Sequence, residues 1–88
     1  MAREISVEKI IETHDKIIEK LGGEKGILNK GIIENAISRI IYPITSELKN
    51  NVIYAAAVLL QAIVLEHPFI DGNKRTGLVI VEDLPRKK

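Results

Sequence analysis

The chain has 88 residues, a net charge of +1 and an apolar fraction of 45%, with only 3% aromatic residues. A chain of this length buries one modest core, and 13 basic against 12 acidic residues leave no basic stripe of the kind that nucleic-acid binders carry. The sequence contains no cysteine, which excludes a disulfide framework and a cysteine-based zinc site. We therefore expect one domain over residues 1–88 and no nucleic-acid partner.

The longest apolar stretch, from Val52 to Leu65, is interrupted by Gln61. It falls short of the roughly 18 residues that a membrane span needs. The first residues are charged and lack the apolar segment of a secretion signal. These features predict a soluble, cytoplasmic protein without a membrane partner.

The first predicted helix runs from about Val7 to Leu21, with Ser6 as its N-cap and Gly22-Gly23 as its stop signal. Its expected buried face follows helical spacing: Val7, Ile10, Ile11, His14, Ile17, Ile18 and Leu21. Because His14 lies in this apolar stripe, we interpret it as a core or edge histidine rather than a catalytic one.

The second predicted helix runs from about Lys30 to Ile41, with Asn29 as a candidate N-cap. Its apolar face consists of Ile32, Ile33, Ala36, Ile37, Ile40 and Ile41. Tyr42-Pro43 ends it, since the residue before a proline is biased away from the helical region.

The third predicted helix spans about Glu47 to Glu66, capped by Thr45 or Ser46. From Val52 to Leu65 it is apolar nearly all round, which places it at the centre of the fold. Gln61 either makes a buried hydrogen bond or points out of the core.

After a loop over residues 67–72, a fourth helix is predicted from Lys74 to about Val81. Leu78 and Val81 are its expected buried residues, with Ile80 as a further candidate, and Gly77 weakens it. The fold class is therefore all-α: a small bundle of about four helices whose central apolar helix leads into the loop.

The loop carries the residues with the most chemistry. Pro68 should break the central helix and leave His67 in a loop, where its imidazole is available. One of Phe69 and Ile70 should insert into the core and fix the course of the loop. Asp71 offers a carboxylate, an oxygen ligand that suits Mg²⁺.

Gly72-Asn73 opens the next helix, where unpaired N–H groups and the helix dipole attract anions. Lys74 and Arg75 add two cations at the same place. Together these residues could supply the base, the metal ligand and the phosphate contacts of phosphoryl transfer. A second interpretation remains open on the residues alone, because Asp-Gly-Asn is also an ordinary turn and Lys-Arg an ordinary solvated pair.

Residues 67–75, His-Pro-Phe-Ile-Asp-Gly-Asn-Lys-Arg, resemble the Fic/Doc family signature, His-Pro-Phe-x-Asp/Glu-Gly-Asn-x-Arg. The His14-Asp15 pair, the Gly22-Gly23 pair and the apolar helix before the loop are similar too. The resemblance implies a Fic/Doc-like bundle and the use of ATP and Mg²⁺.

The resemblance also implies a role for each matching position. His67 would be the general base that takes a proton from a target hydroxyl, and Phe69 would anchor the loop. Asp71 would hold Mg²⁺. The amides of Gly72-Asn73 and the residues after them would bind phosphate, whose charge Arg75 would counter.

Two positions resemble the Doc branch of the family rather than the AMP-transferring Fic branch. Position 74 is Lys instead of a second glycine, and position 78 is Leu instead of a second arginine. In the Doc branch the lysine is thought to orient the nucleotide for transfer of its terminal phosphoryl group. The resemblance therefore implies a toxin that phosphorylates a protein of the translation machinery, with a Fic-type AMP transferase as the alternative.

Family members continue with further helices, whereas this sequence turns polar at Glu82-Asp83 and stops at residue 88. We therefore expect a chain that lacks the family's C-terminal helices. A truncated, inactive module that binds a partner or antitoxin is a further alternative. No Ser/Thr-x-x-x-Glu-Gly/Asn inhibitory motif is present, so inhibition should come from a separate antitoxin. The poorly covered central helix predicts a homo-oligomer.

Overall fold

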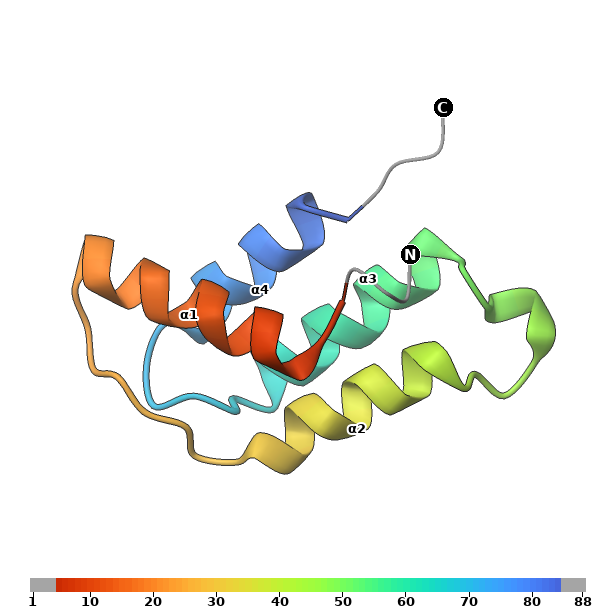
Figure 1. Ribbon diagram of the computed structural model, residues 1–88, viewed down its shortest axis with the longest axis horizontal. Helices are drawn as coiled ribbons and strands as arrows, with labels where there is room; N and C mark the ends of the chain where they lie inside the picture. Colours follow the sequence, from red (N-terminus) through yellow and green to blue (C-terminus); the bar gives the residue numbers. More distant parts are fainter. Residues whose placement is uncertain (1–4, 85–88) are drawn as a thin grey trace.

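The chain folds into an all-α bundle, as predicted (Figure 1). A computed structural model describes residues 5–84. In that range the elements are α1 (Val7–Leu21), α2 (Lys30–Ile41), η2 (Ser46–Leu48), α3 (Val52–Leu60), η3 (Gln61–Leu65) and α4 (Asn73–Glu82). The same residues contain no strand; Ile27 and Phe69 form an isolated antiparallel bridge. None of the helices in this range is both long and apolar enough to cross a membrane.

Helix α1 has the bounds and caps that its sequence predicts. The Ser6 hydroxyl accepts the N–H of Lys9 at 3.0 Å, which satisfies one of the free donors of the first turn. The helix ends at Gly22, whose φ of 87° is in the left-handed region and whose N–H donates to the carbonyl of Ile18. Its buried residues are fewer than the stripe predicted: Ile10, His14 and Ile18. Leu21 is exposed.

Helix α2 also begins and ends where predicted. Ile33, Ala36, Ile37 and Ile40 are buried, while Ile32 and Ile41 are half-buried at the edges of the same face. Asn29 occupies the N-cap position with an extended backbone, but its side chain makes no capping hydrogen bond.

The prediction of one continuous third helix from Glu47 was wrong. Residues 46–48 form only a short 3₁₀ turn, η2, and α3 begins at Val52. The break follows from two adjacent asparagines. Asn50 adopts a left-handed φ of 61°, which asparagine tolerates well. Asn51 accepts the N–H of Tyr54 at 3.0 Å and so caps α3.

The last turn of the central helix is widened into a π-helical segment, η3. The N–H of Glu66 donates to the carbonyl of Gln61 at 3.2 Å, five residues back along the chain. The Gln61 side chain is exposed, so it points out of the core rather than making a buried hydrogen bond.

The central position of α3 and η3 is confirmed, because both contact α2 on one side and α4 on the other. Their buried residues are Ala55, Val58, Leu59, Ala62 and Ile63. The prediction that neighbours surround the central helix on nearly all sides was wrong, since Ile53 is 82% exposed and Leu65 is 73% exposed. The central helix is therefore covered on two sides, and part of its apolar surface faces outward.

Helix α4 extends the predicted segment by one residue at each end and packs against α1, α3 and η3. Its buried residues are Thr76, Gly77 and Ile80, so the prediction that Leu78 is buried was wrong. Gly77 determines which face is buried: a Cβ on it would lie 2.7 Å from Val64 Cγ2. This close approach turns Gly77 toward η3 and leaves Leu78 half exposed.

Candidate active site

Residues 66–72 leave the central helix and run beside the loop that joins α1 to α2 (Figure 1). The carbonyl of Pro68 accepts the N–H groups of Leu28 at 2.7 Å and Asn29 at 3.0 Å. The N–H of Ile70 donates to the carbonyl of Gly26 at 3.1 Å. We call residues 66–72 the site loop; its backbone is held by residues far away in the sequence.

His67 stands where the helix breaks, as predicted. Its φ of 56° lies in the left-handed region, which non-glycine residues seldom adopt but histidine visits more often than most. Pro68, which follows, is buried, whereas the His67 side chain is exposed. The helix end thus directs the imidazole toward solvent.

Phe69 inserts into the core, and Ile70 remains 46% exposed. The Phe69 ring is fully buried and stacks on His14, with ring centroids 3.7 Å apart and planes 4° from parallel. The prediction that one of these two residues fixes the loop is confirmed for Phe69.

Asn73 has a structural role that its sequence position did not reveal. Its Oδ1 accepts the N–H of Phe69 at 3.0 Å, and its Nδ2 donates to the carbonyl of Phe69 at 2.9 Å. The amide group therefore closes the site loop back onto the start of α4. Because the side-chain amide is used in this way, the backbone N–H is the group of Asn73 that remains available to donate to a ligand.

His14 is buried, which confirms its interpretation as a core histidine. Its Nε2 lies 2.7 Å from the carbonyl oxygen of Asp71, and its Nδ1 lies 3.2 Å from Asp15 Oδ1. The bond to Asp71 was not predicted. A signal for it was present, because a polar ring in an apolar stripe needs a hydrogen-bond partner.

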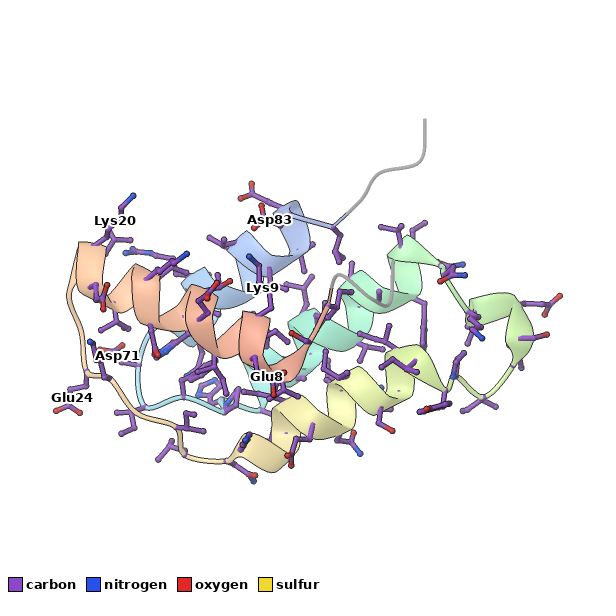
Figure 2. All side chains as sticks on the ribbon, viewed as in Figure 1. Glu8, Lys9, Lys20, Glu24, Asp71 and Asp83 are labelled. Carbon is purple, nitrogen blue, oxygen red and sulfur yellow. The ribbon has the colours of Figure 1, made fainter. Side chains whose placement is uncertain are left out.

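The Asp71 carboxylate is oriented by two backbone amides. Its Oδ1 accepts the N–H of Gly72 at 2.8 Å, and its Oδ2 accepts the N–H of Glu24 at 3.3 Å. Figure 2 shows Asp71 and Glu24 at the same end of the molecule, where the two loops meet. Each carboxylate oxygen has a second lone pair, so these contacts leave acceptor capacity for a cation.

The start of α4 presents donors and positive charge. Gly72 has a φ of 76° and caps the helix, and the N–H of Thr76 makes the first helical bond, to the Gly72 carbonyl at 3.0 Å. The N–H groups of residues 73–75 precede that bond and have no partner within the helix. Lys74 and Arg75 are both exposed at this positive end.

These residues meet at one pocket of about 810 Å³. Its polar lining contains all six predicted site residues: His67, Asp71, Gly72, Asn73, Lys74 and Arg75. Ile17, Ile18, Val64, Ile70 and Leu78 supply the apolar part. An imidazole, a carboxylate, the N–H groups at the start of α4 and two cations thus border one space that could admit a phosphate-bearing ligand.

The carboxylate of this pocket is an oxygen donor of the kind that Mg²⁺ prefers. Within residues 5–84, no three His, Cys, Asp or Glu side chains gather as a metal site. Mg²⁺ usually binds through one or two carboxylates, with water and substrate phosphates completing its shell. Asp71, lining the pocket beside the start of α4, fits that pattern.

Comparison with known proteins agrees with the signature. A family model described as "Fic/DOC family" matches residues 4–84, nearly the whole chain. The chain belongs to the Fic/Doc family. The matched range covers α1 through α4, so the resemblance predicted from the site loop extends to the elements that hold it.

Among Fic/Doc proteins, the relative named "Protein kinase doc" from Escherichia phage P1 is 36% identical over 76 residues. The aligned region is 86% of this chain and 60% of that relative. The chain thus spans about 60% of the length of the curated relative it matches. No solved structure matches it at a significant level.

Proposed function

We propose that this chain is a Doc-like toxin that transfers the γ-phosphoryl group of ATP to a hydroxyl of a protein in the translation machinery. The single observation that carries the proposal is the shared pocket, which His67, Asp71, Lys74 and Arg75 all line. The name of the phage P1 relative, a protein kinase, supports a kinase over other transferases.

In the proposed reaction, His67 is the general base. It takes the proton of the target hydroxyl, whose oxygen forms a bond to the γ-phosphorus as the bond from that phosphorus to the β-γ bridging oxygen breaks. ADP leaves with the electron pair of that bond. A base placed this way contributes about 10²–10⁴-fold in rate. The exposed position of His67 at the pocket supports this role.

The remaining polar residues hold the nucleotide in place. Asp71 would hold Mg²⁺, which when bound neutralises charge on the phosphates. The N–H groups of Gly72-Asn73 and of the residues after them would bind phosphate oxygens. Arg75 would counter the charge of the transferred group, and Lys74 would orient the nucleotide with its γ-phosphate toward His67.

The proposal extends to the cellular context of the chain. A separate antitoxin protein would inhibit the chain, which would act in the cytoplasm as a homo-oligomer. The exposed apolar residues on α3 and η3 support contact with another protein subunit.

AMP transfer is the second candidate reaction, because Fic-type relatives share the signature. Lys74 and Leu78 disfavour it, and both line the pocket. A truncated module that binds a partner without catalysis is the third candidate. Its support is that the chain spans only 60% of the phage relative.

Labelled ATP separates these three candidates. The full chain is incubated with Mg²⁺ and a translation extract, once with γ-labelled and once with α-labelled ATP. We expect γ-label on a protein and its loss in His67→Ala, with nucleotide binding by that variant retained. In Lys74→Gly we expect the label on the target protein to shift from γ-label toward α-label, because this variant should favour AMP transfer.

Other results would support another candidate function or remove His67 from the mechanism. An α-label in the unaltered chain means AMP transfer. Neither label, together with antitoxin binding, means a silent module. Full transfer by His67→Ala would remove the imidazole from the mechanism.

A further inference from the structure

His14 is a buried polar side chain that the proposed chemistry does not use. It is 0% exposed, and a polar group in such a place is costly unless it is hydrogen-bonded. Its Nε2 faces the Asp71 carbonyl at 2.7 Å. Because a carbonyl oxygen only accepts, Nε2 carries the proton, and α1 donates a hydrogen bond to the site loop.

Stacking on Phe69 does not by itself explain a histidine here. A phenylalanine at position 14 could stack on Phe69 equally well and would avoid burying nitrogen atoms. What histidine adds is the donor to Asp71 at 2.7 Å. Histidine at position 14 therefore provides a directional hydrogen bond to the backbone of Asp71 that phenylalanine could not provide.

The other end of Asp71 is held by the turn that ends α1. The carboxylate Oδ2 accepts the N–H of Glu24 at 3.3 Å. Gly23 makes that approach possible, because a Cβ on it would lie 2.8 Å from Asp71 Oδ2 and 3.0 Å from Ile18 Cδ1. Gly22, at the edge of the pocket, differs: a Cβ there would meet no atom within 4 Å.

We propose that His14 is a positioning residue that, together with the Gly23-Glu24 turn, directs the Asp71 carboxylate at a bound metal–nucleotide. This inference rests on the proposed function. His14 on α1 fixes the backbone of Asp71, and the turn after α1 fixes its carboxylate. Among the described residues that line the pocket, Asp71 is the one carboxylate. Partners of this kind, one contact removed from a metal, typically change metal affinity by about 10–100-fold.

A pair of substitutions separates the hydrogen bond from the stack. His14→Phe keeps an aromatic ring on Phe69 and removes the donor to Asp71. His14→Gln removes the ring and places an amide N–H near the position of Nε2. We expect MgATP affinity to fall about tenfold or more in His14→Phe and to be largely restored in His14→Gln.

A second readout does not depend on nucleotide. The amide protons of Gly72 and Glu24 donate to the Asp71 carboxylate, so their NMR chemical shifts report its position. We expect both signals to move in His14→Phe and to return toward their original positions in His14→Gln. A purely structural role would instead follow the stability of each variant and perturb amides throughout the core.

The adjacent glycines give an independent test on a less buried segment. Both have left-handed φ values, 87° for Gly22 and 121° for Gly23, so alanine is strained at either position. Only Gly23→Ala also displaces Asp71 Oδ2. We expect Gly23→Ala to weaken MgATP binding about tenfold and to move the Gly72 and Glu24 amide signals. Gly22→Ala controls for backbone strain in the amide signals, because its Cβ would meet no atom within 4 Å.

The outcomes distinguish the inference from the function on which it rests. If the unaltered chain binds no MgATP, the proposed function fails, and the Gly72 and Glu24 amide signals still decide whether His14 positions Asp71. Should His14→Phe bind MgATP as well as His14→Gln, or Gly23→Ala match Gly22→Ala, His14 and the turn have no positioning role. If both His14 variants fail to fold, the glycine pair decides.

Discussion

At the scale of single residues, backbone groups hold two side chains of the pocket. Phe69 binds the Asn73 amide, and the N–H groups of Gly72 and Glu24 bind the Asp71 carboxylate. From the sequence, position 67 could be placed in a loop because Pro68 follows it, and Asp71 and Arg75 could be placed because a turn precedes a helix. The double hydrogen bond of Asn73 to Phe69 could not be predicted, since an amide in a turn has many local partners. The bond from His14 to Asp71 joins segments that no local pattern connects.

The proposed metal ligand is tested by Asp71→Asn. Asparagine keeps one oxygen acceptor and loses the negative charge that a hard cation prefers. We expect ATP affinity in the presence of Mg²⁺ to fall by at least about tenfold, since loss of even an indirect partner costs roughly 10–100-fold. Calorimetric titration with and without Mg²⁺ measures the effect.

Asp83→Asn is the matched control, because Asp83 lies near the opposite end of α4 from Asp71 (Figure 2). Its affinity should equal that of the unaltered chain. If Asp71→Asn also keeps full Mg²⁺-dependent affinity, Asp71 is only a turn residue.

At the scale of helices, periodicity predicted α1, α2 and α4 to within a residue at each end. It failed for the start of α3: Thr45 stands before only a short turn that begins at Ser46, and Asn51 makes the capping bond of α3. The π-helical segment was also missed, because a single wide turn leaves no repeating pattern. The buried face of α4 was predicted wrongly because Gly77, rather than an apolar side chain, packs closely against Val64.

That close contact predicts a stability change in Gly77→Ala. Alanine favours a helix by about 1 kcal/mol over glycine, but its Cβ would lie 2.7 Å from Val64 Cγ2. Crowding of this kind typically costs about 1–3 kcal/mol. We expect the crowding to dominate and the melting temperature to fall by several degrees, as measured by circular dichroism.

Gly31→Ala serves as the control, since Gly31 is exposed in α2 and its Cβ would approach only the flexible end of Asn29, at 3.0 Å. It should be neutral or stabilising. A Gly77→Ala protein that melts higher than Gly31→Ala would mean that Val64 moves aside at little cost.

At the scale of the whole molecule, the sequence predicted an apolar helix with too few neighbours. Ile53 and Leu65 on α3 and η3 are mostly exposed, and Leu78 on α4 is half exposed. The fold class is confirmed. That residues 1–88 form one domain without the family's C-terminal helices stays a prediction, as does the homo-oligomer, because both concern what surrounds the described residues.

We expect the chain to self-associate through these exposed apolar side chains. Burying an isoleucine or leucine contributes about 1.5–3 kcal/mol, a large share of the stability of a small domain. Sedimentation velocity at micromolar concentration should show a dimer or larger species. Ile53→Glu should shift it toward monomer, because a charge cannot be buried in an apolar contact.

Ile44→Glu is the matched control, since Ile44 is 95% exposed in the connection between α2 and η2. It should leave the association unchanged. A monomer that melts cooperatively at every concentration would show that the described helices form a stable fold without self-association.

The bond between His14 and Asp71 has a consequence for when activity can arise during folding. The two residues are 57 positions apart, whereas the contacts within each helix are local and form quickly. Contacts across such a separation must first overcome the entropy of closing the intervening chain. We therefore expect the site to assemble late, after α1 and α4 have docked, so that a nascent or partly unfolded chain would carry the signature residues without the proposed activity.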